Sequence, residues 1–438
     1  MSILSKEESK IILDRALKLS KAEECEVMLT GYVEGNIRTA LNAVSTTGEK
    51  SNTILSISAS FGKRTGSATI NEFDDASLER VIRRAEELAK LAPENPEYMP
   101  VPEPQTFKES ITFNTDTASV SATKRASLVL QSLDVAKAAK LDAASFFSNS
   151  VKFTAMQNSK GLFAYNKETD VSFSVTVRNQ EGTGSGYVSE SYNNIKKLDT
   201  KALTHNAARK AETSAGAKAM EPAKYTVILE PLAGEGLMSF LINALEARSA
   251  DEGRSFMSKK GGGARIGEQL FDSRVNIYSD PMNPEMPSST WSNDGLSREN
   301  ITWVKDGIVQ NLSSTRYWAR LKGVKPVPSP AAVIMEGGKG SIDDLIRETE
   351  KGILVTRFWY TRMVDPQTLT LTGLTRDGTF YIENGKISFP IKNFRFNESP
   401  ITMLNNLEAL GKPVRVGNMI IPPMKIREFT FTSLSDAV

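Results

Sequence analysis

Histidine and cysteine are almost absent from this chain of 438 residues, which has one of each, His205 and Cys25. A single cysteine excludes an internal disulfide and is typical of a protein from a reducing compartment. A hydrolytic zinc site needs about three protein ligands, usually imidazole or thiolate groups, and an open position for water. One histidine and one cysteine are too few for such a ligand set.

Long apolar runs and a surplus of one charge sign are also missing. No apolar stretch approaches the roughly 20 residues of a membrane span, and the start MSILSKEESK carries charges where a signal peptide has an apolar run. The 54 lysines and arginines nearly balance the 52 aspartates and glutamates, which disfavours a surface built for nucleic acid. We therefore expect a cytoplasmic protein that binds neither membranes nor nucleic acids.

The rest of the composition is ordinary for a globular protein, with 39% hydrophobic and 24% charged residues. This length predicts about two or three domains. We take the small and polar stretch Ala211–Pro222 as the boundary between the two large ones. The expected fold class is α+β. An N-terminal α/β domain over residues 1–215 combines antiparallel sheets with helices, and a β-rich C-terminal domain covers residues 222–438.

The N-terminal domain begins with a regular pattern of helix and strand signals. A capping box predicts the start of a helix over residues 5–20. Alternating apolar residues over 25–71 predict four antiparallel strands, with breaks that include Gly35 and Thr47–Glu49. A second helix is expected from Asp74 to the residue before Pro93.

The same order recurs after the proline-rich connector Pro93–Pro104, which can form neither a helix nor a central strand. Helices are predicted at residues 121–140 and 200–214. Between them, strand-like runs lie at Ala143–Ser150, Val151–Asn158, Thr169–Asn179 and Gly184–Glu190. The N-terminal domain is therefore predicted to repeat one layout of helix, four strands and helix.

The C-terminal domain opens with a buried strand, Tyr225–Leu229, that passes into a helix at Glu230-Pro231. The helix is predicted from apolar residues spaced three and four apart, namely Leu237, Phe240, Leu241 and Leu245. A strand that passes directly into a helix places side chains at a lip, where many sites lie. Two carboxylates, Glu230 and Glu235, occupy this lip, and we expect them to face one cavity.

Short strands and turns dominate the remaining sequence. Asp306-Gly307 and Asn384-Gly385 predict tight hairpins. The alternating segment Thr368–Thr372 predicts a half-buried strand, which at a sheet edge would accept an extended peptide by backbone pairing. We interpret Phe358–Tyr360 as sheet core rather than as a stacking platform for bases. The glycine-rich run Ser258–Arg265 lacks the spacing of a phosphate-binding loop and predicts a mobile loop.

Several blocks of the second half carry a resemblance to a known family. They are YSDP, VKDGIVQNLSSTRYWARLKG, MEGGKGSIDDLIRETEKGILVTRFW, LTGLTRDGTFYIENGKISFPIKNFRF and IPPMKIREFTF. In this order they resemble the C-terminal half of the TldD/PmbA family, which is named for modulators of DNA gyrase. The resemblance is strong from residue 222 onward. Before residue 222 it concerns only the order of the predicted helices and strands. It implies a cytoplasmic protein and pairing between two related subunits, of which one carries a metal motif.

The segment around the lip occupies the position that this metal motif has in the family. In the metalloprotease branch it reads HExxxH, where two histidines hold zinc. This chain has Glu230, Pro231 and Glu235 at the three defining places, and a proline cannot act as a general base. The resemblance therefore implies the TldE/PmbA-like branch. We expect a non-catalytic subunit of a complex that processes or degrades small unfolded peptides. No cofactor is expected in this chain, and zinc is expected in its motif-bearing partner.

Other interpretations of this chain stay open. In one of them, Glu230 and Glu235 are ordinary polar residues at the start of a helix, because carboxylates are stabilised near a helix N-terminus. Alternatively, the chain is a metallopeptidase in its own right with an unrecognised metal set, since two carboxylates suit a hard cation when further oxygen ligands join them. A regulator linked to DNA gyrase is disfavoured by the balanced charge. The partner is a TldD-like subunit or a second copy, through an interface mainly from residues 222–438 that exceeds ~2,000 Å² if obligate.

Overall fold

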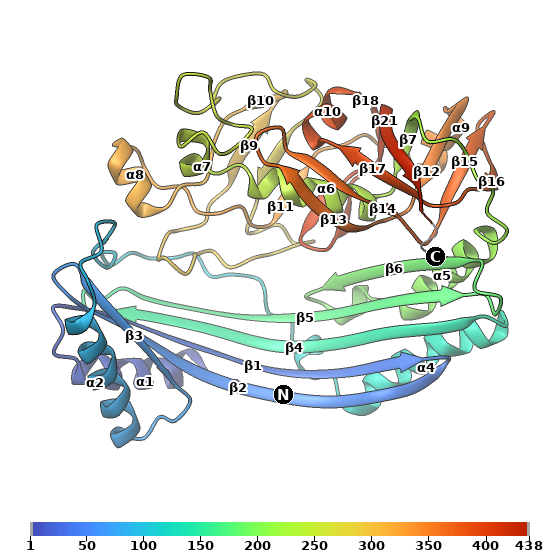
Figure 1. Ribbon diagram of the computed structural model, residues 1–438. Coiled ribbons are helices and arrows are strands. Elements are labelled where there is room, and N and C mark those ends of the chain that lie inside the picture. Colours follow the sequence, from blue (N-terminus) through green and yellow to red (C-terminus); the bar gives the residue numbers. More distant parts are fainter. Residues whose placement is uncertain (1–2, 436–438) are drawn as a thin grey trace.

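The computed structural model describes residues 3–435 and has two layers. A long, curved six-stranded sheet lies beneath a body that contains two further sheets, and helices α1, α2 and α4 lie on the far side of the curved sheet (Figure 1). The first helices are α1 (Lys6–Leu19), α2 (Asp75–Leu91), α3 (Thr115–Ala118), α4 (Ala122–Ala138) and α5 (Thr200–Thr213), with a short 3-10 helix η1 (Ile195–Lys197). Within the described residues, no helix is both long and apolar enough to cross a bilayer.

The curved sheet is antiparallel throughout, in the order β3-β2-β1-β4-β5-β6. Its strands are β1 (Glu24–Ala40), β2 (Ala43–Phe61), β3 (Arg64–Ile70), β4 (Asp142–Asn158), β5 (Phe163–Arg178) and β6 (Ser185–Tyr192). The order helix, three strands, helix occurs twice, as α1-β1-β2-β3-α2 and as α4-β4-β5-β6-α5, and β1 pairs with β4 where the halves meet. The division into domains at residues 215 and 222 stays a prediction.

The predicted count of four strands in each half is wrong, because two expected breaks lie inside strands. β1 continues through Gly35, where an added Cβ would lie 2.2 Å from a guanidinium nitrogen of Arg125. This glycine therefore permits a close approach and does not end the strand. β2 continues through Thr47–Glu49, and the actual turn is at Leu41-Asn42, where φ is +48° and +58°. In the second half, residues 143–158 form the single strand β4.

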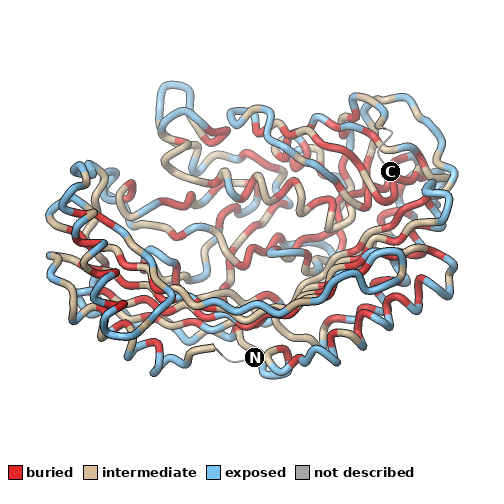
Figure 2. The backbone as a smooth tube through the Cα atoms, turned by 60° about the horizontal axis from the view of Figure 1, so that its bottom comes forward, coloured by how far each residue is buried: buried red, intermediate tan, exposed pale blue. Residues whose placement is uncertain are grey.

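Buried and partly exposed positions alternate along the long strands (Figure 2). On one face, Val27 and Leu29 of β1 pack into a core with α1 and α2, and Phe173 and Val175 of β5 pack with α4 and α5. Burial of such side chains stabilises the folded chain by roughly 1.5–3 kcal/mol each before entropy is subtracted. The two halves of the sheet are therefore held on their helices by separate apolar cores.

The opposite face of the curved sheet carries charged groups and meets the upper body. Glu26 of β1 and Asp170 of β5 lie on this face, and burial raises the pKa of both carboxyls. Arg316 opposes this shift at Glu26, and Lys152 and Arg415 oppose it at Asp170. Since Arg316 and Arg415 belong to the upper body, this polar face of the sheet lies against that body.

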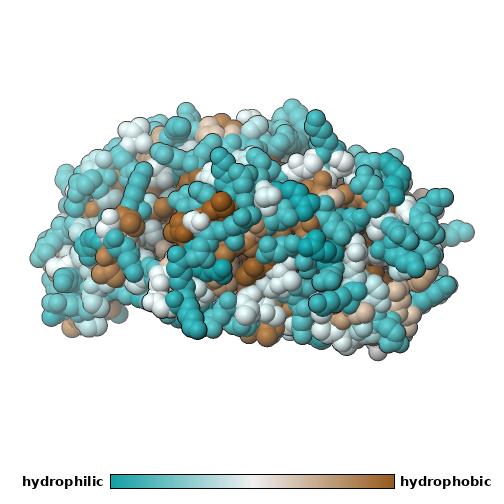
Figure 3. Space-filling model, turned by 90° about the horizontal axis from the view of Figure 1, so that it is seen from above, coloured by the Kyte–Doolittle hydropathy of each residue, from teal (hydrophilic) through white to brown (hydrophobic). Residues whose placement is uncertain are grey.

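The upper body contains a nine-stranded and a second six-stranded sheet. The larger sheet has the order β13-β14-β17-β21-β7-β12-β15-β16, with β18 on β21, and the smaller one has the order β10-β9-β8-β11-β20-β19. The pairs β7–β12 and β11–β20 are parallel and the other pairs of these sheets are antiparallel. The predicted α+β class is therefore confirmed. Seen from above, the surface is mainly hydrophilic with small apolar patches (Figure 3).

Most elements of this body are short, as its many turn signals predict, and the longest are α6 and β21. The strands are β7 (Lys224–Leu229), β8 (Ile277–Ser279), β9 (Ile301–Lys305), β10 (Ile308–Val309), β11 (Val333–Met335), β12 (Lys351–Val355), β13 (Phe358–Asp365), β14 (Thr370–Thr375), β15 (Thr379–Glu383), β16 (Lys386–Pro390), β17 (Phe394–Glu398), β18 (Leu407–Leu410), β19 (Val414–Val416), β20 (Met419–Ile421) and β21 (Met424–Leu434). The helices are α6 (Pro231–Asn243), α7 (Ala247–Asp251), α8 (Arg316–Lys322), α9 (Ile342–Arg347) and α10 (Pro400–Asn405). The hairpins predicted at Asp306-Gly307 and Asn384-Gly385 are confirmed.

Two expectations for the nine-stranded sheet change. Leu369 and Leu371 are fully buried, as the alternating pattern predicts, but β14 pairs with β13 on one side and with β17 on the other. It is therefore no edge strand, and β13 lies at the edge instead. Of Phe358–Tyr360, predicted as sheet core, only Phe358 is buried, since Trp359 and Tyr360 follow it onto the exposed part of this edge.

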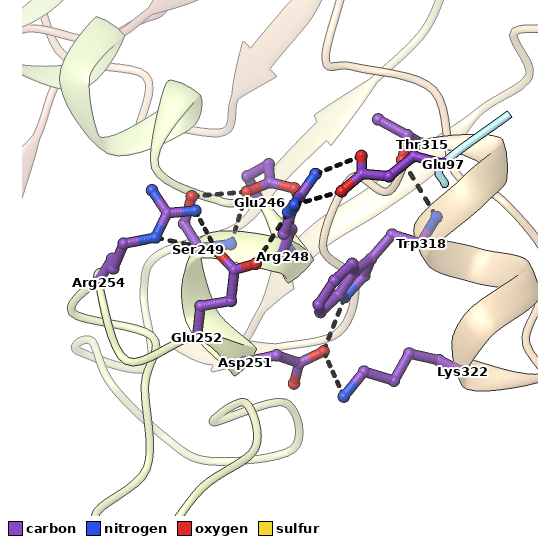
Figure 4. Close-up of polar contacts among 10 residues, drawn as sticks. All are labelled: Glu97, Glu246, Arg248, Ser249, Asp251, Glu252, Arg254, Thr315, Trp318 and Lys322. Atoms are coloured by element: carbon purple, nitrogen blue, oxygen red, sulfur yellow. Dashed lines mark hydrogen bonds and ion pairs between the residues drawn. The ribbon is translucent and has the colours of Figure 1, made fainter. Parts of the chain in front are cut away.

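A polar network fixes the proline-rich connector to the upper body (Figure 4). Arg248 of α7 donates two hydrogen bonds to the carboxylate of Glu97, at 2.7 and 2.9 Å. Beside it, Trp318 of α8 donates from its indole nitrogen to Asp251 at 2.9 Å, and Lys322 pairs with the same carboxylate at 3.1 Å. A paired guanidinium and carboxylate favour one mutual orientation, so the connector is held in a defined position against α7 and α8.

Candidate functional site

A cavity of about 540 Å³ lies where the curved sheet meets the upper body. Its walls come from β6 and α5 below and from the start of α6, from α9 and from β19 above. The lip predicted from the sequence forms part of this wall. β7 ends at Leu229, Glu230 is the N-cap of α6 with extended backbone, and Pro231 occupies the first helical turn. Proline suits this position because its missing N–H would have no partner there.

Glu230 forms an ion pair with Lys210 of α5, with 2.6 Å between Oε2 and Nζ. The side chain of Lys210 is 4% exposed and that of Glu230 is 16% exposed. Charges in such surroundings persist only when they are paired, because desolvation of either one alone is costly. The pair therefore links α5 of the lower layer to the first turn of α6 in the upper body.

Glu235 lies further along α6, and the structure places it apart from Glu230 and Pro231. Those two residues line the cavity, whereas Glu235 is not among its lining residues. Its carboxylate lies instead against the turn between β19 and β20, where a Cβ added at Gly417 would be 3.3 Å from Oε1. Burial raises the pKa of Glu235, and within residues 3–435 its side chain forms no hydrogen bond or ion pair.

The cavity combines charged groups with apolar walls. Its charged lining residues are the cations Arg209, Lys210, Lys339, Lys412 and Arg415 and the carboxylates Glu190, Glu230 and Asp343. Its apolar lining includes Val188, Leu203, Leu232, Ile342, Ile346, Leu354, Ile387, Val414 and Val416. Burial raises the pKa of Glu190, which accepts a hydrogen bond of 3.0 Å from Tyr192. A ligand of matching chemistry has both an apolar part and a charged part.

The histidine and the cysteine of the chain both lie away from the cavity. His205 is an exposed residue of α5 that does not line it. Cys25 is buried in β1, and burial raises the pKa of its thiol to about 11. In the part of the chain that the structure describes, no group of three or more His, Cys, Asp or Glu side chains is placed to hold a metal ion. The residues at the motif positions therefore do not fit a zinc ion, since Glu230 is bound to an ammonium group.

Sequence reasoning missed Lys210, which is the partner of Glu230, and Arg415, which is a further cation of the cavity lining. The periodicity of α5 offers a signal for Lys210, because it lies seven residues after Leu203 and three after Ala207, on the face that is buried. Its partner is on another element and follows the expected domain boundary, so no local pattern indicates the ion pair. Arg415 lies in the short strand β19, which we did not predict.

The fold and the site together define an α+β protein of two layers, with a strand-to-helix lip at a cavity between them. Sequence models described as the PmbA/TldA metallopeptidase domain 1, central domain and C-terminal domain match residues 25–89, 116–215 and 222–433. The chain therefore belongs to the PmbA/TldD metallopeptidase family, and the resemblance inferred from the sequence is confirmed.

Individual relatives are distant. The chain is 22% identical over 231 residues to metalloprotease PmbA of Escherichia coli O157:H7, covering 50% of this chain and 49% of the relative. It is 22% identical over 286 residues to a metalloprotease of Methanothermobacter thermautotrophicus, covering 60% and 61%. The matches thus span roughly half the length of these curated relatives. The structure of TldE from Thermococcus kodakarensis superposes with a TM-score of 0.86 at 18% identity, covering 97% of this chain and 99% of that one, which shows a shared fold.

Proposed function

We propose that this chain is the non-catalytic subunit of a cytoplasmic TldD/TldE-type metalloprotease complex that processes or degrades small unfolded peptides. The observation that carries the proposal is the buried Lys210–Glu230 ion pair. Glu230 stands where the metalloprotease branch has its first metal-binding histidine. A metal cation would compete with the Lys210 ammonium for the same carboxylate oxygens, so this arrangement favours a site without metal.

The role left to this chain is to shape a cleft for peptide. Glu230 and Pro231 contribute to the cavity wall. Glu235 lies outside this cavity in the chain alone, and its place in the cleft of the assembled complex stays a prediction. The zinc ion and the water that it activates belong to the motif-bearing partner in this proposal. The apolar walls of the cavity support it, because an unfolded peptide presents apolar side chains that a folded protein buries.

The edge strand β13 is the surface that we propose for the partner subunit. Four of its residues are exposed apolar or aromatic side chains, namely Trp359, Tyr360, Met363 and Val364, which are 36%, 59%, 38% and 59% exposed. The Arg376 guanidinium lies 4.1 Å from the Trp359 ring centroid and that of Arg362 lies 4.2 Å from the Tyr360 ring centroid. Trp, Tyr and Arg are the residues that dominate binding energy in protein interfaces, and an uncovered apolar edge strand invites association.

Co-expression with a motif-bearing relative tests the proposal. We expect the two chains to sediment as one complex, the complex to cleave an unfolded peptide, and a chelator to abolish cleavage. This chain alone is expected to cleave nothing. Stoichiometric, tightly bound zinc in the isolated chain, or chelator-sensitive cleavage by it, would instead establish a metallopeptidase in its own right.

A variant pair tests the interface. We expect Tyr360→Lys on β13 to weaken the complex by at least ~10-fold in Kd, because it places a charge in the centre of the apolar edge. Leu130→Lys is the matched control, since Leu130 is also an exposed apolar residue but lies on α4, far from β13 in the fold (49% exposed). Equal effects of the two substitutions would exclude β13 as the interface.

A further inference from the structure

The cavity beside Glu230 holds more positive charge than its ion pairs neutralise. Of its five cationic side chains, only Lys210 is paired with a carboxylate. Among residues 3–435, no carboxylate oxygen lies within 4.0 Å of the charged nitrogens of Arg209, Lys339, Lys412 or Arg415. The first three of these are exposed, and we name them the rim cations.

Arg415 is the inner cation of this set. Its Nη1 donates a hydrogen bond of 2.6 Å to the carbonyl oxygen of Glu285, and its guanidinium lies 5.3 Å from the ring centroid of Tyr192. Its Nε is buried and has no hydrogen-bond partner in the described chain. A guanidinium with a free N–H is well suited to a carboxylate, because its donors match the two carboxylate oxygens.

The carboxylates that share the cavity do not fill this role. Glu230 is engaged by Lys210, and Glu190 accepts from Tyr192. Asp343 is exposed at the start of α9 and forms no ion pair within the described chain. Asp170 and Glu285 act on Arg415 through their charges but form no ion pair with it. The rim cations have no carboxylate partner among residues 3–435, so they can accept an anionic group from outside the chain.

Apolar side chains line the same cavity as the rim cations and Arg415. They include Leu203 of α5, Leu232 of α6, Ile342 and Ile346 of α9, and Val416 of β19. A volume of about 540 Å³ is within the usual range for a bound small ligand. The matching ligand thus carries an anionic group next to an apolar one, as a peptide does at its carboxyl end when its last side chain is apolar.

We propose that this cavity binds the carboxyl end of a short peptide with an apolar last residue. Arg415 and the rim cations hold the terminal carboxylate, and the apolar wall holds the last side chain. This inference rests on the proposed function and names the substrate class of the same cleft. The Lys210–Glu230 pair keeps the wall in place without contacting the terminal carboxylate.

Binding to the isolated full-length chain tests the assignment. The probe is the labelled tetrapeptide Ala-Ala-Ala-Leu as the free acid, compared with the same peptide as the carboxyl-terminal amide. We expect the acid to bind at least about 10-fold more tightly than the amide, because charge-assisted hydrogen bonds are lost with the carboxylate. Equal affinities would overturn the proposal. So would inorganic phosphate that displaces the acid at concentrations where acetate does not, because the site would then select phosphate.

Substitutions at the rim locate the effect. We expect Arg209→Gln combined with Lys412→Gln to weaken binding of the acid by about 10-fold and to leave binding of the amide unchanged. Both side chains are exposed, so the fold is expected to persist. Lys201→Gln is the control, since Lys201 is an exposed residue of the same helix that does not line the cavity. An equal loss in the control would show that net charge rather than the cavity governs binding.

This assay and the pairing experiment fail independently. A chain that prefers the free acid but never associates with a motif-bearing relative retains the binding site and loses the subunit role. A complex that cleaves peptides, but whose subunit shows no preference between acid and amide, retains the subunit role and loses the carboxylate site.

Discussion

Helix α6 has two carboxylates with different surroundings. Glu230 is at the start of the helix, and Glu235 lies where the helix contacts the β19–β20 turn. At the start, Glu230 is paired with Lys210 at 2.6 Å. Beside the β19–β20 turn, Glu235 is also largely removed from solvent, but no cation or hydrogen-bond donor of the described chain contacts its carboxylate. Burial raises the pKa of Glu235.

This difference shows that the sequence motif alone does not decide what a carboxylate does. Both residues are glutamates at positions that the resemblance inferred from the sequence matches to histidines of the metalloprotease branch. One is paired with a lysine from the lower layer, whereas burial without a partner raises the pKa of the other. The environment of each side chain is therefore set by the element that packs against it.

Removal of the Lys210 ammonium is expected to have the largest effect on stability. Lys210→Met leaves the Glu230 carboxylate buried without its partner, and loss of one member of a buried pair costs about 3–5 kcal/mol. The free energy of unfolding from urea denaturation measures the effect. Lys10→Gln is the control, because Lys10 pairs with Asp14 at an exposed site with both side chains nearly half exposed, and such pairs contribute about 0–1 kcal/mol. Similar losses in both variants would show that the Lys210–Glu230 pair is not a buried pair in solution.

Neutralisation of both partners is expected to have a smaller effect than removal of one. Lys210→Met combined with Glu230→Gln removes both charges, so no unpaired ion remains, and we expect about half or more of the single-variant loss to be recovered. A double-mutant cycle on the unfolding free energies measures the coupling. Additive losses from Lys210→Met and Glu230→Gln would contradict a direct interaction across 2.6 Å.

The sequence predicts features that depend on neighbours along the chain. The hairpins at Asp306-Gly307 and Asn384-Gly385 have positive φ at both turn residues, which those residue types tolerate. Gly35 was misinterpreted as a break because its role comes from Arg125, which is 90 residues away. Fold class and local turns are therefore predictable from periodicity and turn chemistry, whereas close approaches between distant segments are not.

The candidate site also has features that local sequence predicts and features that it does not. The strand-to-helix transition at Glu230-Pro231 follows from buried strand residues and from the preference of proline for a first helical turn. That Glu230 is neutralised by Lys210, and that Arg415 reaches the same cavity, depends on packing between two layers. The position of the cavity was thus predictable, and the sign of its charge was not.

A third prediction concerns the crowding of Glu235 by the β19–β20 turn. Gly417 has φ of +52°, and an added Cβ would lie 3.3 Å from Oε1 of Glu235. We expect Gly417→Ala to cost about 1–2 kcal/mol from the left-handed backbone, as the control does, and a further amount from the tight contact with Glu235. Gly62→Ala is the matched control, with φ of +57° and no atom within 4 Å of the added Cβ. A loss no greater than that of the control would show that the Glu235 side chain moves aside freely.

The smallest expected effect is the pH dependence that Glu235 contributes. Burial raises the pKa of this carboxyl above its ordinary value of 4.5, so the folded chain binds the proton more tightly than the unfolded chain. The associated stabilisation is complete below the ordinary pKa and is lost as the pH rises through the raised value.

Glu235→Gln cannot ionise and keeps a similar shape. We therefore expect its stability relative to the parent to improve as the pH rises from 4.5 through the raised pKa of Glu235, as measured by urea denaturation at several pH values. Glu235→Asp retains an ionisable group and is expected to follow the parent. If Glu235→Gln and Glu235→Asp show the same pH dependence, Glu235 is solvated in the free chain, and the contrast with Glu230 then depends on Lys210 alone.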